Sequence, residues 1–167
     1  MRWGLIGAST IAAEYMIGAI RAHEGNSVDA VLSSSRARAD AYAAAHDIPN
    51  ADTELSVLLA RPEIDAVYIS TTNEKHRDQA LAAIAAGKHV LCEKPLAMSV
   101  ADARTMVEAA REAGLVFATN HHLRCAGAHR AAKALVERAR AQVASALGAD
   151  GADVVFVSGA TEAAALA

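Results

Sequence analysis

The stretch RWGLIGASTIA, residues 2–12, begins with apolar residues, continues into a turn of small residues and leads directly into an alanine-rich helical pattern. This order is typical of the strand–turn–helix that begins a dinucleotide-binding βαβ unit, where the pyrophosphate lies at the helix N-terminus. The glycine fingerprint is degenerate, because Gly7 is in place while Ser9 and Ala12 stand at the second and third glycine positions. A buried strand with a tight turn explains the stretch equally well, so the pattern alone leaves both interpretations open.

Strands and helices alternate along the chain that follows. The apolar runs predict strands at residues 28–32, 64–70, 89–92 and 115–119, and helical patterns predict helices at 11–22, 36–46, 54–60, 74–86 and 100–113. Strands that alternate with helices at this spacing form a parallel sheet covered on both faces. The sequence therefore predicts an α/β fold, a Rossmann-type doubly wound parallel sheet in three layers, with the nucleotide at the first turn.

Composition narrows the function classes. Hydrophobic residues make up 53% of the 167 residues but aromatic ones only 4%, which predicts a core of Ala, Val, Leu and Ile. A net charge of −3 argues against nucleic acid or an anionic membrane as a partner. Cys92 and Cys125 lack the spacing of metal or redox motifs, and the first strand begins right after Met1 without a targeting pattern. We expect a cytoplasmic protein.

The end of the second predicted strand bears on the choice of cofactor. An NAD site usually carries an Asp or Glu there to hold the ribose 2′-hydroxyl. This chain has Ser33 and Ser34 instead, with Arg36 and Arg38 just beyond. Serine hydroxyls and an arginine fork suit a 2′-phosphate, which favours NADP(H). The alternative is that both arginines are solvated on the face of a helix.

The segment GKHVLCEKPL, residues 87–96, contains a Glu-Lys-Pro motif that resembles the signature of the Gfo/Idh/MocA family of NAD(P)-dependent sugar and inositol oxidoreductases. The resemblance extends through DAVYIST (65–71), TTNEKH (71–76) and TNHHLR (119–124), and covers residues 1 to about 130. Together with RWGLIGASTIA, these segments look most like an NADP-dependent branch that reduces sugar-like ketones. The resemblance strengthens the prediction of a nucleotide site.

Within that motif, Lys94 is the candidate catalytic residue. Reduction of a ketone needs a hydride from the nicotinamide and a proton for the developing alkoxide. Lys94 stands at the carboxyl end of a predicted parallel strand, where such folds bind ligands, and its ammonium can stabilise the oxyanion or donate a proton. Pro95 keeps Lys94 out of the helical conformation, and family members commonly hold this peptide bond cis. Without the resemblance, Lys94 is also consistent with a surface lysine at a strand end.

The resemblance further implies cofactor contacts in the first turn, after the second strand, along residues 71–76 and beside the Glu-Lys-Pro motif. The predicted cofactor-binding residues are Gly7, Ser9, Thr10, Ile11, Ser33, Ser34, Arg38, Thr71, Thr72, Asn73, His76, Glu93, Lys94 and Asn120. By itself, His76 fits a solvent-facing helix residue better than a ligand. No metal site is predicted, because the adjacent His121 and His122 do not project to one point.

The chain departs from the family after about residue 128. Members of the family run to about twice this length, and a second domain supplies their substrate pocket. Here HRAAKALVERARAQVASALGADGADVVFVSGATEA, residues 129–163, resembles the N-terminal region of cysteine desulfurases, whose SGATEA turn cradles the phosphate of PLP. The Schiff-base lysine segment of those enzymes is absent, so PLP catalysis is not expected. The resemblance points to a chimeric or truncated chain.

We therefore predict an NADP-binding Rossmann domain over residues 1–124 and a tail over 125–167. The tail comprises a long helix (129–147) ended by Gly148, a strand (154–157) and a terminal helix (160–167), packed on the same sheet. Three functions remain open: an NADP(H)-dependent oxidoreductase acting on a sugar-like ketone, a cofactor-binding module without catalysis, and a structural chimera. An oligomer through the C-terminal helix is a further expectation.

Overall fold

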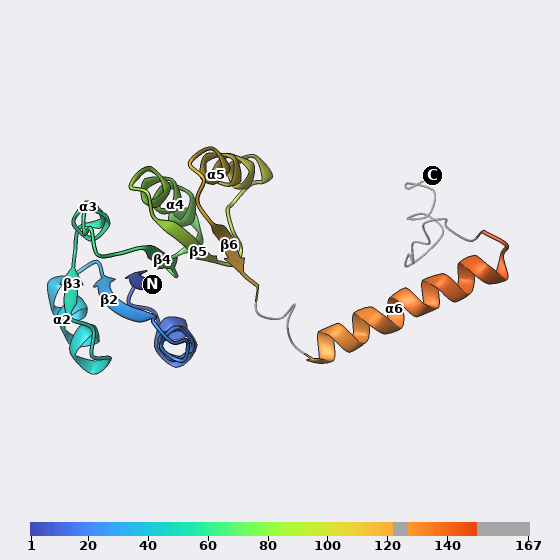
Figure 1. The fold of residues 1–167 in the computed structure, drawn as a ribbon, viewed down its shortest axis with the longest axis horizontal. Helices are drawn as coiled ribbons and strands as arrows, with labels where there is room; N and C mark the ends of the chain where they lie inside the picture. Colours follow the sequence, from blue (N-terminus) through green and yellow to red (C-terminus); the bar gives the residue numbers. More distant parts are fainter. Residues whose placement is uncertain (122–126, 150–167) are drawn as a thin grey trace. The chain divides into compact units, whose positions relative to one another are not determined.

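The computed structural model describes residues 1–121 and 127–149. It divides into two units, 1–120 and 121–167. The first is built on a six-stranded parallel sheet (Figure 1). Its strands are β1 (Arg2–Ile6), β2 (Ser27–Leu32), β3 (Asn50–Asp52), β4 (Ala66–Ile69), β5 (His89–Glu93) and β6 (Phe117–Asn120), in the spatial order β3-β2-β1-β4-β5-β6.

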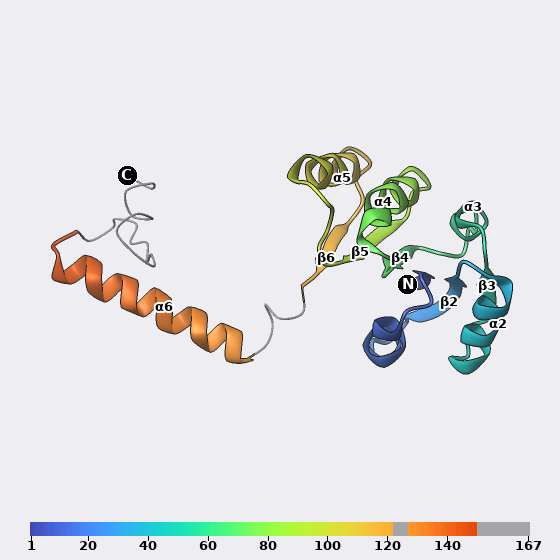
Figure 2. The same ribbon diagram turned by 180° about the vertical axis from the view of Figure 1, so that it is seen from behind.

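Helices cover both faces of this sheet, as Figures 1 and 2 show. One face packs against η1 (Ala12–Met16), α1 (Ile17–Arg21) and α2 (Arg36–Ala45). The other packs against α3 (Leu55–Leu59), α4 (His76–Ala85), which follows the short η2 (Asn73–Lys75), and α5 (Val100–Glu112). The Rossmann-type fold predicted from the alternation of strands and helices is confirmed.

Alternating side chains give the sheet two separate cores. Leu5 packs among residues of the α1–α2 face, while its neighbour Ile6 packs among those of the α3–α5 face. All four residues of β4 are buried, as expected for a central strand covered on both sides. The strand order reverses between β1 and β4, and in open parallel sheets ligands bind at such a reversal, beyond the carboxyl ends of the strands.

The first helix differs from the prediction of one continuous helix over residues 11–22. The segment begins with the π-helical turn η1, and only α1 is a regular α-helix. Ala12 and Ile17 are both buried although they lie five positions apart, a spacing that an α-helix places on different faces. The wider π turn brings both side chains onto the sheet.

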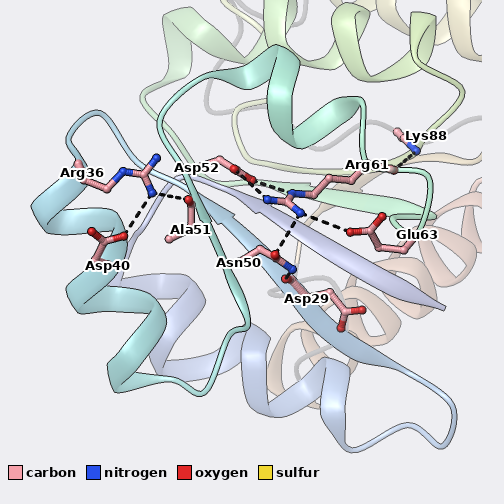
Figure 3. Close-up of polar contacts among 9 residues, drawn as sticks. All are labelled: Asp29, Arg36, Asp40, Asn50, Ala51, Asp52, Arg61, Glu63 and Lys88. Carbon is pink, nitrogen blue, oxygen red and sulfur yellow. Dashed lines mark hydrogen bonds and ion pairs between the residues drawn. The ribbon is translucent and has the colours of Figure 1, made fainter.

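Strand β3 is absent from the prediction, which has no strand between the helices expected at 36–46 and 54–60. It is three residues long and polar at both ends, so it has no apolar alternation to detect. Its polar groups are satisfied from outside the strand: the Asn50 amide donates to the carbonyl of Asp29 over 2.8 Å, and Arg61 donates to Asn50 and to Asp52 (Figure 3).

Arg61 is the centre of this polar network (Figure 3). Its Nε and Nη2 donate to the two carboxylate oxygens of the buried Asp52 over 3.0 and 3.1 Å, and Nη1 lies 3.5 Å from Glu63. The buried ammonium of Lys88 donates to the carbonyls of Arg61 and Ile64 over 2.9 and 2.8 Å. These contacts fix the edge strand β3 and the loop that leads into β4.

The second unit contains α6 (Gly127–Ala146). The helix matches the predicted range 129–147 closely, and Gly148 follows it with a φ of 64°. The amide of Ala149 donates to the carbonyl of Ala144 over 2.8 Å, the pattern expected where glycine ends a helix. The predicted strand at 154–157, the helix at 160–167 and the SGATEA turn lie outside the described residues. Self-association through α6 stays a prediction.

Candidate functional site

A pocket of about 440 Å³ lies beyond the carboxyl ends of the strands, at the reversal of strand order. Its walls come from the turn after β1, the ends of β2 and β3, the loop after β4 and the start of α4. The lining residues are Gly7, Ala8, Ser9, Leu32, Ser33, Ser34, Arg38, Thr53, Leu55, Ser70, Thr71, Thr72, Lys75 and Gln79.

The turn after β1 is held tightly against the loop after β4. Gly7 has a φ of 111°, and a Cβ there would lie 3.2 Å from the main-chain carbon and oxygen of Ser70. The Ser9 hydroxyl donates to that of Ser70 over 2.7 Å and accepts from the amide of Ala12 over 3.2 Å. Only glycine fits at residue 7, whereas serine at the second fingerprint position serves as the link between two loops.

Ser33 is a lining residue of this pocket whose hydroxyl oxygen is buried. The residue is 5% exposed, and its amide donates to the carbonyl of Asp52 over 3.0 Å. Its hydroxyl has no hydrogen-bond partner among the residues that the structure describes. Because buried polar atoms are nearly always paired, a hydroxyl left over on a pocket wall fits a ligand oxygen or N–H as its partner.

The two arginines considered for a 2′-phosphate have different positions. Arg38 lines the pocket, and its Nη2 donates to the carbonyl of Ala8 over 2.7 Å. Arg36 is not among the lining residues and instead donates to the carboxylate of Asp40 over 3.3 Å and to the carbonyl of Ala51 over 2.5 Å (Figure 3). The alternative of a solvated arginine in an exposed ion pair thus describes Arg36.

The formal charge of the pocket lining is positive. The lining residues include Arg38 and Lys75, and none of them is an Asp or Glu. Among the acids that adjoin lining residues in the chain, Asp52 is turned to Arg61, which holds both of its oxygens. Glu54 and Glu74 are exposed, and Glu74 accepts from the Thr72 hydroxyl. The described pocket is therefore suited to an anionic ligand.

A second polar cluster surrounds the Glu-Lys-Pro motif. The Glu93 carboxylate is buried and accepts from the Tyr68 hydroxyl over 2.5 Å and from the Asn120 amide over 2.7 Å. Burial, followed by the hydrogen bond to Glu93, raises the pKa of Tyr68 well above its ordinary value. The Lys94 amide donates to Glu93 over 3.2 Å, its side chain is exposed, and the Lys94–Pro95 bond is cis, as the family resemblance implies.

The predicted site residues fall into three groups. The pocket lining contains Gly7, Ser9, Ser33, Ser34, Arg38, Thr71 and Thr72, and the cluster at β5 and β6 contains Glu93, Lys94 and Asn120. Outside the lining, Thr10 and Ile11 precede η1, Asn73 begins η2, and His76 begins α4 with its ring fully buried. Their roles as cofactor contacts stay predictions.

Several lining residues were not among the predicted site residues: Ala8, Leu32, Thr53, Leu55, Ser70, Lys75 and Gln79. Ser70 directly follows β4, and Thr53 directly follows the unpredicted β3. The rule that ligands bind beyond the carboxyl ends of parallel strands would have found Ser70. Gln79 lies a full helical turn into α4, where only the folded structure shows that it faces the pocket.

Within 1–121 and 127–149, no group of three or more His, Cys, Asp or Glu side chains is arranged to hold a metal ion. Over the same residues, no helix combines the length and apolarity needed to cross a membrane.

Comparisons with known proteins agree with this geometry. A model described as an oxidoreductase family with an NAD-binding Rossmann fold matches residues 1–121. The 1,5-anhydro-D-fructose reductase of Ensifer adhaerens is 60% identical over 139 residues, which are 83% of this chain and 41% of that protein. The trans-1,2-dihydrobenzene-1,2-diol dehydrogenase of Bos taurus is 36% identical over 119 residues, which are 70% of this chain and 35% of that protein. The chain spans less than half the length of these relatives.

Solved structures give the same result. A 3-ketoreductase from Actinomadura kijaniata, crystallised with NADP and TDP-benzene, has a TM-score of 0.76 and 30% identity, over 83% of this chain and 42% of that one. The biliverdin reductase of Synechocystis, crystallised with biliverdin and NADP⁺, has a TM-score of 0.73 and 29% identity, over 81% and 42%.

A second family model, aminotransferase class V, matches residues 99–167 and overlaps the first from residue 99 to 121. It is consistent with the resemblance of the tail to a class of PLP enzymes, but it covers less than half of the chain. The first model covers the whole sheet and every residue of the pocket and of the Glu-Lys-Pro cluster. With a pocket at the reversal of a doubly wound parallel sheet and a matching family model over residues 1–121, the chain belongs to the Gfo/Idh/MocA family of NAD-binding oxidoreductases.

Proposed function

We propose that this chain binds NADP(H) in preference to NAD(H), and that it is the cofactor half of a reductase that transfers hydride to a sugar-like ketone such as 1,5-anhydrofructose. The unpaired hydroxyl of Ser33 carries the proposal for the cofactor, because it is buried on a pocket wall that also contains Arg38. The 60% sequence identity to a 1,5-anhydro-D-fructose reductase over 139 residues supports the proposed substrate class.

The fit to a 2′-phosphate rests on charge. A ribose 2′-hydroxyl is best held by a carboxylate, and the described pocket lining contains none. A 2′-phosphate oxygen can accept from the Ser33 hydroxyl, and Arg38, already held at the carbonyl of Ala8, can offer its remaining N–H donors. Asp52 does not oppose such an anion, because Arg61 neutralises it.

The catalytic proposal assigns the proton to Lys94. The bound nicotinamide supplies the hydride. The exposed ammonium of Lys94, next to the buried Glu93, stabilises the alkoxide that develops on the substrate oxygen and delivers a proton to it. Glu93 is itself fixed by Tyr68 and Asn120, so the strand end that carries Lys94 is held from two neighbouring strands.

The cofactor proposal is tested by fluorescence titration with NADPH and NADH side by side. We expect NADPH to bind about tenfold or more tightly than NADH. Ser33→Asp should reverse the order, because a carboxylate repels the 2′-phosphate and accepts from a 2′-hydroxyl. Arg38→Gln should weaken NADPH alone, whereas Arg36→Gln, outside the pocket lining, serves as the matched control and should change neither affinity. Equal or tighter binding of NADH contradicts the proposal.

Turnover is tested separately, by following NADPH oxidation with 1,5-anhydrofructose. The proposed role of Lys94 predicts activity that Lys94→Met abolishes while NADPH affinity stays within a few-fold of wild type. Cofactor binding without turnover would instead favour a cofactor-binding module. That alternative has an observation behind it, because the chain spans 41% of the length of the reductase it resembles.

A further inference from the structure

The ring of His76 connects the two parts of the site. His76 begins α4 and is fully buried. Its Nδ1 lies 2.9 Å from the carbonyl oxygen of Pro95, the residue after Lys94, and its Nε2 lies 3.2 Å from the carbonyl oxygen of Thr71, which lines the pocket. One imidazole therefore spans the loop after β4 and the loop after β5.

The chemistry of the ring limits what it can do there. Both partners are carbonyl oxygens, which only accept, and a neutral imidazole has a single N–H. A neutral ring can therefore donate to only one of the two oxygens. The contact to Pro95 has the usual length of an N–H···O hydrogen bond, about 2.9–3.0 Å, whereas the contact to Thr71 is at the long end of the range.

Thr71 also has an anchor that does not depend on the ring, because its hydroxyl donates to the Gln79 side chain over 2.5 Å. Pro95 has no amide N–H, so its own main chain cannot donate a bond that would hold the loop. Since the ring can donate only once, the loop after β5 gains more from that bond than the loop after β4.

We propose that His76 is a positioning residue for Lys94, present as the Nδ1–H tautomer and donating to the carbonyl of Pro95. Lys94 is then fixed on both sides: Glu93 before it is held by Tyr68 and Asn120, and Pro95 after it is held by His76. The importance of this position for catalysis rests on the proposed role of Lys94, but the tautomer and the anchoring do not depend on it.

The tautomer is measured directly on the wild-type chain. Long-range ¹H–¹⁵N correlation spectra distinguish a protonated Nδ1 from a protonated Nε2 by their nitrogen chemical shifts. We expect the His76 Nδ1 signal in the range of a ring N–H and the Nε2 signal in the range of a bare nitrogen. The reverse assignment, or protonation of both nitrogens at neutral pH, overturns the proposal. This measurement needs no variant and no cofactor.

The anchoring is tested by a pair of conservative variants. The amide nitrogen of asparagine occupies the place of Nδ1, and that of glutamine the place of Nε2, so His76→Asn retains the donor to Pro95 and His76→Gln loses it. Hydrogen exchange of the Lys94 amide, which donates to Glu93, reports the order of this loop. We expect exchange about tenfold faster in His76→Gln and nearly unchanged in His76→Asn.

The amide of Val90, in the strand β5 that precedes Lys94, is the internal control and should keep its rate in both variants. Faster exchange at Val90 would indicate general destabilisation of the variant. The proposal would then stand or fall on the tautomer of His76 measured in the wild-type chain. Equal acceleration of Lys94 in both variants, with Val90 unchanged, contradicts the proposal. A failure of NADPH preference leaves all of these results unaffected, so the two proposals fail separately.

Discussion

The hydroxyl of Tyr68 donates to Oε1 of Glu93 over 2.5 Å inside the sheet, and this bond joins β4 to the strand end that carries Lys94. Tyr68→Phe removes one donor from a buried carboxylate. Because hydrogen bonds to charged groups contribute more than neutral ones, we expect the free energy of unfolding to fall by about 2 kcal/mol. Urea denaturation measures this, with Tyr15→Phe as the control, since Tyr15 is 62% exposed. Equal stabilities of the two variants would argue against the bond.

The same pair predicts a dependence of stability on pH. Burial and Glu93 raise the pKa of Tyr68, so the folded state retains the phenol proton where the unfolded chain loses it. The contribution is complete below the ordinary tyrosine pKa of about 10 and is lost as the pH rises above it. Between about pH 9 and pH 11, the wild type should therefore lose stability more steeply than Tyr68→Phe. Parallel profiles of unfolding free energy would contradict this.

Cys92 should be inert in the folded protein. It is fully buried, and burial, with a smaller contribution from Glu93, raises the pKa of its thiol to about 12. The reactive thiolate is therefore scarce at neutral pH. In a Cys125→Ser background, which leaves Cys92 as the single cysteine, we expect an aromatic disulfide reagent to react only as fast as the protein unfolds. Rapid stoichiometric reaction of the native protein would show that the thiol is accessible.

Arg61 should be a major contributor to the stability of the β3 edge. Arg61→Met leaves the buried Asp52 without its bidentate partner, and we expect a loss of about 3 kcal/mol in unfolding free energy. Arg61→Lys retains the charge but not the paired geometry and should lose about 1 kcal/mol. Arg104→Lys, on the exposed side of α5, is the control and should have little effect. If Arg61→Met left the free energy of unfolding unchanged, solvent would be compensating the lost ion pair of Asp52.

Gly7→Ala should damage both stability and cofactor binding. The φ of 111° is unfavourable for alanine, and the added Cβ would press on the main chain of Ser70, so we expect a loss of about 1–3 kcal/mol in unfolding free energy. Dinucleotide affinity should fall with it, because the turn lines the pocket. Gly18→Ala in α1 is the matched control. Nothing lies within 4 Å of a Cβ there, and the helix should gain about 0.5–1 kcal/mol.

The sequence predicts most of the fold because the central strands are long apolar runs between clear helix boundaries. It fails at β3, which has polar residues at both ends. The Asn50 side chain donates to Asp29 and accepts from Arg61, and the local sequence pattern does not reveal such contacts. Residue type alone makes Arg36 and Arg38 equal candidates for the 2′-phosphate, and only the family resemblance selects Arg38, although positions two apart on a helix project about 200° apart. That angle, applied to the predicted helix, indicates that only one of them faces the nucleotide.

His76 shows the other limit. By itself, its position at a helix start indicates a solvent-facing side chain, and that expectation is wrong, because the ring is buried between two carbonyl oxygens. The cofactor contact that the family resemblance implies for His76 stays a prediction. Pro95 lies 19 residues further along the chain and comes close only because β4 and β5 are neighbours in the sheet. Burial of this kind follows from strand order, which the periodicity of a single segment does not reveal.

Every residue that lines the pocket comes from the segment between Gly7 and Gln79, whereas Lys94 and its supports Glu93 and Asn120 come later in the chain. The proposed nucleotide pocket and the proposed catalytic lysine are thus encoded in successive blocks of the gene. A ribosome finishes the first block before it reaches the second, and recombination can exchange whatever follows the sheet without altering a pocket residue. A lineage can in this way acquire new substrates while inheriting its coenzyme unchanged.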